Sequence, residues 1–216
     1  MLIKFNDIVE KYGNPKGIIH IGAHLMEERI DYKHNGLDNT IWVEANPELF
    51  SKIEFINHEF GDELVINNTI SDEDGKLYKF NVTNNGQSSS ILELDKHKIH
   101  HPQIHVTDVI EVSSKRMDTL IMENNIDIDN YDFLNIDIQG AELLALKGFG
   151  DLLNNIKFIY TEINTNYLYK DCALVSEIDE YLEKYGFERV ETSMTEFEWG
   201  DALYLNNNRE INHNRL

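Results

Sequence analysis

The chain has 216 residues, of which 41% are hydrophobic, so it is long enough for one domain with a full core and too short for a second full domain. Its 39 acidic and 19 basic residues give a formal net charge of −20. Such a charge repels nucleic-acid backbones and anionic lipid surfaces, so we expect neither nucleic acid nor a membrane among the partners. A neutral or cationic small molecule is compatible with it.

The cysteine content and the hydropathy of the sequence indicate where in the cell the protein is located. Cys172 is the only cysteine, which excludes an intrachain disulfide and fits a reducing environment. The N-terminal stretch alternates charged with apolar positions and lacks the apolar core of a signal peptide, and no apolar run is long enough to cross a membrane. We therefore expect a soluble, cytoplasmic protein.

Short apolar runs alternate with amphipathic segments, a pattern typical of an α/β fold in which crossover helices join parallel strands. The apolar runs predict strands at residues 17–22, 40–45, 64–70, 132–138, 158–163, 187–193 and 201–206. Helices are predicted at residues 25–36, from Pro47 to Ile56, and at 115–125, 141–155 and 173–185. Leu25, Ile30 and Tyr32 are predicted to face the core from the first of these helices.

Residues 71–110 replace a single crossover helix with a longer segment. Asp74-Gly75 is a turn signal followed by alternating apolar and polar residues, which predicts a hairpin-like insertion and then an irregular polar loop. Long loops in compact domains tend to carry function. We therefore predict a single domain over residues 1–206 with an insertion and acceptor loop at 71–110, and a flexible tail over the polar residues 207–216.

The first predicted strand ends at Gly22-Ala23-His24, where open parallel sheets place their ligands. Glycine lets the backbone approach a ligand, and Glu44 at the end of the second strand can accept both ribose hydroxyl hydrogens of a nucleoside. A dinucleotide site needs three glycines to hold a pyrophosphate, whereas residues 22–27 contain one. The pattern favours a nucleoside without phosphate, of which S-adenosylmethionine is the common one, over NAD.

Two later strand ends also carry carboxylates. Asp137 ends the fourth predicted strand and Glu162 the fifth, so these acids and Glu44 should meet at one edge of the sheet. Buried acids side by side are costly unless a cation or hydrogen-bond donors compensate them, so the cluster indicates a site, although Asp137 could instead cap a helix. Asp137 is the first candidate for a general base, Glu162 the second, and His24 a third.

The loop at residues 84–105 would lie over the acceptor side of this site. The candidate acceptor-binding residues are Gln87, Ser88, Ser89, Ser90 and His101 in the loop, with Gln139 and Asn164 at the strand ends. The histidines at 97, 100, 101 and 105 fit no standard zinc motif. A magnesium site made from Asp137, Glu162 and Asn164 is chemically possible, but we predict no resident metal.

In their order along the chain, these motifs resemble the FkbM family of S-adenosylmethionine-dependent methyltransferases. The matching stretches cover about residues 16–206 and are IIHIGAH (18–24), WVEANP (42–47), TISDEDG (69–75), SSSIL (88–92), MDTL (117–120), DFLNIDIQGAELLALKG (132–148), YTEIN (160–164) and WGDALYL (199–205). Family members commonly have an aspartate where His20 stands and a second glycine where Met26 stands.

The resemblance implies a Rossmann-like class I methyltransferase fold. Its seven-stranded, mostly parallel sheet would have an antiparallel last strand and helices on both faces. The resemblance also implies S-adenosylmethionine as cofactor. The residues that would bind it are Gly22, Ala23 and His24, Glu44 with Ala45 and Asn46 beside it, Ser71 and Asp72 near the adenine, and Asp137.

The expected activity is O-methylation of a hydroxyl of a sugar, a glycan or a small metabolite. A methyltransferase acting on the amino groups of adenine or protein is disfavoured, because Asp137-Ile138-Gln139-Gly140 stands where such enzymes usually have Asn or Asp, two prolines and an aromatic residue. Two alternatives stay open. One is a non-catalytic nucleoside-binding module or pseudo-enzyme, which the departures at His20 and Met26 allow. The other is a nicotinamide-dependent sugar oxidoreductase, which would need a glycine-rich turn and a Tyr-x-x-x-Lys pair.

Overall fold

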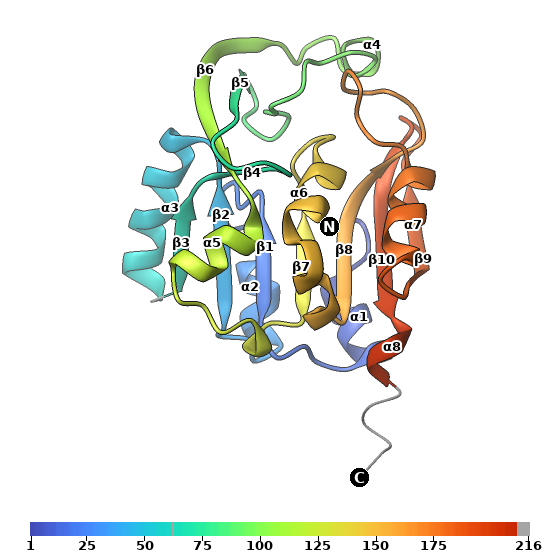
Figure 1. Cartoon of the computed structure of the whole chain (residues 1–216). Helices are drawn as coiled ribbons and strands as arrows, with labels where there is room; N and C mark the ends of the chain where they lie inside the picture. The colour runs from blue at the N-terminus through green and yellow to red at the C-terminus, as the bar shows by residue number, and fades with distance from the viewer. Residues whose placement is uncertain (62, 211–216) are drawn as a thin grey trace.

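The computed structural model describes residues 1–61 and 63–210, which form a seven-stranded sheet between two layers of helices (Figure 1). The strand order is β3-β2-β1-β7-β8-β10-β9. Strand β10 runs antiparallel to both of its neighbours, and every other pair in this sheet is parallel. The predicted fold class, a Rossmann-like α/β sheet with an antiparallel last strand, is confirmed.

All seven predicted strands are present. They are β1 (Ile18–Ile21), β2 (Thr40–Glu44), β3 (Leu64–Asn67), β7 (Phe133–Ile136), β8 (Phe158–Asn164), β9 (Phe187–Met194) and β10 (Trp199–Asn206). Every residue of β1, β2, β7 and β8 is buried, as parallel strands covered on both faces should be. Their short apolar runs therefore gave a clear sequence signal.

The helices divide into two layers, one on each face of the sheet. Helices α1 (Phe5–Tyr12), α2 (Arg29–His34) and α3 (Pro47–Phe60) pack on one face, and α5 (Met117–Glu123), α6 (Glu142–Phe149) and α7 (Val175–Glu183) on the other. Two 3-10 helices, η1 (Ile128–Asn130) and η2 (Gly150–Asn155), follow α5 and α6. Ile18 packs in the first layer and Ile19 in the second, because successive strand residues point to opposite faces.

The first crossover helix differs from its prediction. Helix α2 starts at Arg29, and its predicted core residues Leu25 and Ile30 are 39% and 65% exposed, whereas Tyr32 is buried. The backbone turns tightly before the helix, with Met26 at a φ of +59°, so residues 25–28 do not continue its helical phase. The amphipathic helix α1, which buries Phe5, was not predicted.

The segment at 71–110 contains a hairpin of β5 (Leu77–Thr83) and β6 (Val106–Lys115), and the end of β6 also pairs with β4 (Thr69–Ile70). The loop between β5 and β6 includes the short helix α4 (His97–His100). In Figure 1 this hairpin lies above the carboxyl ends of β1 and β2, and α4 lies above the same edge of the sheet nearer to β8 and β10. This is the edge where parallel sheets bind ligands.

At the C-terminus, β10 runs directly into the short helix α8 (Asn207–Glu210). Residues 211–216 of the predicted flexible tail lie outside the described residues. Within the described part of the chain, the helices are all too short or too polar to cross a membrane.

Candidate active site

Two adjoining cavities open at the carboxyl ends of the central strands. The apolar cavity, beside β2 and the hairpin, encloses about 580 Å³, and the polar cavity, beside β8 and β10, about 1380 Å³. Both are lined by Gly22, His24, Gln87, Asp137 and Gln139. These five residues therefore mark the junction where two bound molecules would meet.

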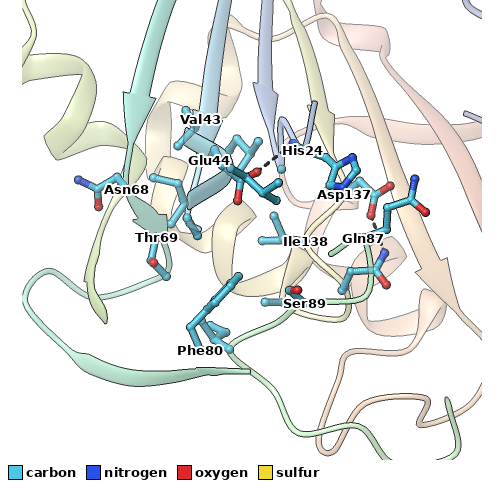
Figure 2. A pocket seen from close by; sticks show the side chains of 18 of the residues that line it. His24, Val43, Glu44, Asn68, Thr69, Phe80, Gln87, Ser89, Asp137 and Ile138 are labelled. Atoms are coloured by element: carbon cyan, nitrogen blue, oxygen red, sulfur yellow. Dashed lines mark hydrogen bonds between the residues drawn. The ribbon is translucent and has the colours of Figure 1, made fainter. Parts of the chain in front are cut away.

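Glu44 lies in the wall of the apolar cavity at the end of β2 (Figure 2). Its Oε2 accepts a hydrogen bond from the His24 backbone N–H at 2.9 Å, and its Oε1 accepts one from the Asn46 N–H at 2.7 Å. Burial raises the pKa of this carboxyl, while the two N–H groups act against that rise. Because a carboxylate has about four acceptor positions, the side chain can still accept hydrogen bonds from ribose hydroxyls.

The walls of this cavity are largely apolar. Figure 2 shows Val43, Phe80 and Ile138 around the space that Glu44 borders, and Leu49 and Ala45 also line it. Asn46 lies behind this wall, where its side chain accepts a hydrogen bond from the Glu48 N–H and caps α3.

Gly22 connects the two halves of the site. Its φ is +94°, and a Cβ built on it would lie 1.9 Å from the backbone oxygen of Asp137. The loop after β1 therefore touches the end of β7 through backbone alone, which only glycine permits. The adjacent Ala23 is buried in the core and does not line either cavity.

The residues just before Ser71 and Asp72 line the apolar cavity. Asn68, Thr69 and Ile70 line the apolar cavity, as Figure 2 shows for Asn68 and Thr69. Ser71 is fully buried behind them, and its hydroxyl bonds to Tyr78 Oη at 2.8 Å and to Asp72 at 3.1 Å. Neither Ser71 nor Asp72 is among the lining residues, because the chain turns away toward α6, where Gly148 packs against the Ser71 carbonyl.

The polar cavity brings together the two predicted acids of β7 and β8. Gln139 Nε2 donates to Asp137 Oδ1 and to Glu162 Oε2, both at 2.7 Å. Tyr169 Oη in turn donates to Gln139 Oε1 at 2.5 Å, which fixes the orientation of the amide. Gln139 adopts a φ of +59°, an uncommon conformation for a residue other than glycine. Backbone strain at this point is typical of a functional site.

Both acids hold their protons more tightly than free carboxyls. Burial among protein atoms, with a further contribution from Asp201, raises the pKa of Asp137 to about 6, although its side chain is open to the cavity. Burial also raises the pKa of Glu162 well above its usual range, and the neighbouring Asp137 adds to the rise. A base whose pKa lies just below neutrality is suited to accept a proton during catalysis.

Glu142 is a buried acid nearby, with a structural role. Its Oε1 accepts hydrogen bonds from the Ile138 and Gly140 N–H groups at 3.1 and 3.0 Å. Burial raises the pKa of Glu142 to about 7. The side chain therefore holds the turn that presents Asp137 and Gln139, and it lines neither cavity.

His24 lies at the junction with a φ of +43°. Its Nδ1 is 2.6 Å from Glu27 Oε1, a contact that raises the pKa of His24. A Cβ built on Gly86 would lie 3.2 Å from His24 Nε2, so the ring also contacts the loop at 84–105. Because the contact with Glu27 favours the protonated imidazole over the neutral one, His24 is a weaker candidate for the base than Asp137.

The predicted acceptor residues are distributed around both cavities. Ser88 and His101 line the polar cavity, and Ser89 lines the apolar one. Ser90 is buried and donates from Oγ to the Gln139 carbonyl at 2.8 Å, so it supports the turn. Asn164 is 1% exposed, and its amide atoms have no hydrogen-bond partner among the described residues.

Sequence reasoning missed several residues that line the polar cavity. They are His20 and Asn135 on the central strands, Tyr160 on β8, Trp199 and Asp201 on β10, and Met1 and Glu28. Asp201 and Trp199 belong to the WGDALYL motif, and their alternate strand positions could have placed the two on one face of β10. Burial lowers the pKa of His20, whose neutral ring bonds to Tyr32 Oη at 3.1 Å.

Of the loop histidines, His97 and His101 pack together with their ring centroids 5.0 Å apart, whereas His100 and His105 have other partners. His100 lies 3.2 Å from Glu198, and His105 Nδ1 contacts the Gln103 carbonyl. Within residues 1–61 and 63–210, no group of three or more His, Cys, Asp or Glu side chains is arranged to hold a metal ion.

A sheet of this order, with a glycine loop after β1 and an acid at the end of β2, defines the Rossmann-like methyltransferase class. The model of the methyltransferase FkbM domain matches residues 19–189, and the chain belongs to this methyltransferase family. No curated protein matches the sequence significantly.

Solved structures show the same fold at low identity. Magnesium protoporphyrin IX methyltransferase from Synechocystis PCC 6803, with bound SAH, is 9% identical, with a TM-score of 0.54 over 95% of this chain and 82% of that one. The M. capricolum TrmK structure, with S-adenosyl-homocysteine, is 11% identical, with a TM-score of 0.50 over 96% of this chain and 70% of that one.

Proposed function

We propose that the protein is an S-adenosylmethionine-dependent O-methyltransferase that acts on a hydroxyl of a sugar, a glycan or a small metabolite. The observation that carries the proposal is the position of Asp137, which lines both cavities at their junction. A carboxylate in that place can reach an acceptor in the polar cavity next to a nucleoside in the apolar one.

The apolar cavity fits the cofactor chemically. Glu44 supplies a buried carboxylate for ribose hydroxyls, and Phe80 and Ile138 supply apolar surface for an adenine. The loop at residues 22–27, with its single glycine, lacks the backbone shape that a pyrophosphate needs, so it favours a nucleoside without phosphates over NAD. Family membership also supports methyl transfer over hydride transfer.

S-Adenosylmethionine, when bound, supplies an electrophilic methyl group whose transfer to a hydroxyl breaks the C–S bond, leaves S-adenosylhomocysteine and releases the hydroxyl proton. Asp137 accepts that proton, because its pKa of about 6 leaves it ionised at neutral pH. Gln139 and Tyr169 hold its carboxylate in place. The remaining contribution of the protein is to align the acceptor and exclude water.

The acceptor in this proposal is a small molecule in the cytoplasm. The formal net charge of −20 opposes association with a nucleic acid, and the one cysteine, Cys172, is a free buried thiol, as is common in reducing compartments. Gln87, Ser88 and Ser89 offer hydrogen bonds to hydroxyl groups of a sugar or polyol.

Calorimetry with S-adenosylhomocysteine and with NAD tests the nucleoside site, and we expect binding of the first alone. Incubation with methyl-labelled cofactor and mixtures of sugars, glycans and metabolites, read by mass spectrometry, should then reveal an acceptor that gains one methyl group. Binding of NAD without S-adenosylhomocysteine would contradict the proposal, and cofactor binding without any labelled product would favour the non-catalytic alternative.

A further inference from the structure

Two acids face each other directly in the wall of the polar cavity. Glu162 on β8 is the antiparallel register partner of Asp201 on β10, and both line the cavity. Directly opposed residues have Cβ atoms about 4.5–5.5 Å apart, where like charges destabilise the pair. Both side chains are 6% exposed, so water screens the repulsion little.

Neutral donors hold these acids without cancelling their charge. Asp201 Oδ2 accepts from the Leu2 N–H at 2.6 Å and from Tyr160 Oη, and Glu162 Oε2 accepts from Gln139 Nε2. Burial raises the pKa of Glu162, and the negative charges of Asp137, Glu142 and Asp201, in that order, add to the rise. The negative charges of Glu162 and Asp201 are therefore not balanced by a positive side chain next to them.

The rest of the cavity wall is also negative. Its described lining residues include five carboxylates, those of Glu27, Glu28, Asp137, Glu162 and Asp201, and no lysine or arginine. The α-amino group of Met1 also lines the cavity and lies 3.7 Å from Glu28 Oε1. Glu27 pairs with His24 Nδ1 at 2.6 Å, whereas Asp137, Glu162 and Asp201 form no ion pair with a described lining residue.

Unpartnered polar groups accompany the acids. His97 lines the cavity and is 6% exposed, and its Nδ1 has no hydrogen-bond partner among the described residues. Burial lowers the pKa of His97 to about 4, so its neutral ring can lie beside a cation. Asn164 follows Glu162 by two strand residues on the same face of β8, and both of its amide atoms are unpartnered among the described residues, although it lies behind the residues that line the cavity. Buried polar atoms in this state point to a missing ligand.

Aromatic side chains complete this end of the cavity. Tyr160, Tyr169 and Trp199 all line it. The faces of such rings attract cations and also stack on the apolar faces of sugar rings. Acids, neutral imidazole and aromatic rings together form a setting that suits an organic cation.

We propose that the acceptor carries an ammonium group, as an amino sugar or an amino alcohol does, and that Glu162 and Asp201 bind it while the hydroxyl to be methylated faces Asp137. This inference rests on the proposed methyltransferase function. Glu162 and Asp201 line the polar cavity but not the apolar one, so a cation that they bind lies apart from the adenine and ribose of the cofactor. The α-ammonium of the cofactor's methionine is the competing cation, and binding tests in protein saturated with S-adenosylhomocysteine, which carries the same group, distinguish the two.

The binding of three matched sugars tests, without any catalytic turnover, whether the polar cavity prefers an ammonium group. Glucosamine carries an ammonium group, glucose replaces it with a hydroxyl, and N-acetylglucosamine removes its charge. In protein saturated with S-adenosylhomocysteine, we expect glucosamine to bind at least tenfold more tightly than the other two, by calorimetry or ligand-observed NMR. Glucosamine that binds no more tightly than glucose would overturn the inference.

Two variants test whether Glu162 and Asp201 cause the preference for glucosamine. Glu162→Gln and Asp201→Asn should each reduce the preference for glucosamine to less than threefold, whereas Glu111→Gln, an exposed acid on β6, should leave it unchanged. A preference that survives both variants would place the ammonium group elsewhere and overturn the assignment. Circular dichroism checks folding, and the two substitutions lie on different strands, so one serves if the other fails to fold.

Calorimetry with S-adenosylhomocysteine alone separates this inference from the proposed function. Loss of a charge preference in protein that still binds S-adenosylhomocysteine contradicts the ammonium site only. Wild-type protein that does not bind S-adenosylhomocysteine contradicts the proposed function itself, whatever the sugar probes show.

Discussion

Gly22 and Asp137 touch through their backbones, since a side-chain carbon on Gly22 would lie 1.9 Å from the Asp137 oxygen. The loop after β1 and the end of β7 are therefore positioned by each other. The first belongs to the nucleoside side of the site and the second carries the proposed base. A change at Gly22 should consequently disturb both.

Gly22→Ala tests this coupling. We expect the substitution to destabilise the protein by roughly 2–4 kcal/mol, because the added carbon collides with backbone and the φ of +94° is also strained. Gly75→Ala is the matched control, with a φ of +73° and no atom within 4 Å, and should cost only about 1 kcal/mol. Urea unfolding measures both values. Equal losses of stability would show that the backbone contact is unimportant.

Glu44→Ala should weaken the binding of S-adenosylhomocysteine by about 1–3 kcal/mol, because it removes a buried carboxylate that can bond to ribose hydroxyls. The change also frees the His24 N–H, which bonds to that carboxylate at 2.9 Å. Glu54→Ala, an exposed position on α3, is the control and should leave affinity unchanged. Calorimetry gives both constants, and unchanged affinity in Glu44→Ala would remove this residue from the cofactor site.

The strands, and the positions of the acids at their ends, followed from the sequence because burial on both faces leaves continuous apolar runs. Glu44, Asp137 and Glu162 end such runs, and the topology of a parallel sheet brings those ends to one edge. The structure accordingly places all three acids on the two adjoining cavities. Local sequence patterns were therefore sufficient to predict the strands and the position of these acids.

Other features depend on contacts between distant residues. The facing of Glu162 and Asp201 requires the register of β8 and β10, which no local pattern reports. The turns at His24 and Met26 place two residues other than glycine at positive φ, so the helical pattern from Leu25 was misleading. These conformations are set by tertiary packing that overrides local propensity.

Asp137 should set the acidic limb of the pH–rate profile. Because a general base must be ionised, and the pKa of Asp137 is raised to about 6, turnover should rise through pH 6 and reach a plateau above it. Asp137→Asn should lower turnover by about 10²- to 10⁴-fold and change the affinity for S-adenosylhomocysteine far less. Steady-state rates from pH 5 to 9 check this point, and an unchanged limb in the variant would exclude Asp137 as the base.

The raised pKa of Asp137 also predicts how the stability of the folded protein depends on pH. The pKa of Asp137 is about 6 in the folded protein and near 3.8 in an unfolded chain, so the folded state binds more protons between these values. The contribution of this residue to stability is therefore greatest below pH 3.8 and is lost as pH rises through 6. Asp137→Asn should accordingly raise the melting temperature at pH 7.5 and have little effect at pH 4, as thermal unfolding at the two pH values would show. A variant less stable than wild type at pH 7.5 contradicts this sign.

Tyr169→Phe tests the positioning of the base. Tyr169 Oη donates to Gln139 Oε1 at 2.5 Å and so directs the amide N–H groups toward Asp137, and that hydrogen bond lowers the Asp137 pKa against the effect of burial. Without the hydroxyl, we expect turnover to fall about three- to tenfold, in line with the loss of about 0.5–1.5 kcal/mol for one hydrogen bond, and the acidic limb to move to higher pH. Tyr167→Phe, at a residue 46% exposed, is the matched control and should change neither quantity. If turnover falls but the acidic limb of the pH–rate profile stays in place, Tyr169 only packs against the turn. If the acidic limb moves to higher pH, Tyr169 influences the proton transfer to Asp137.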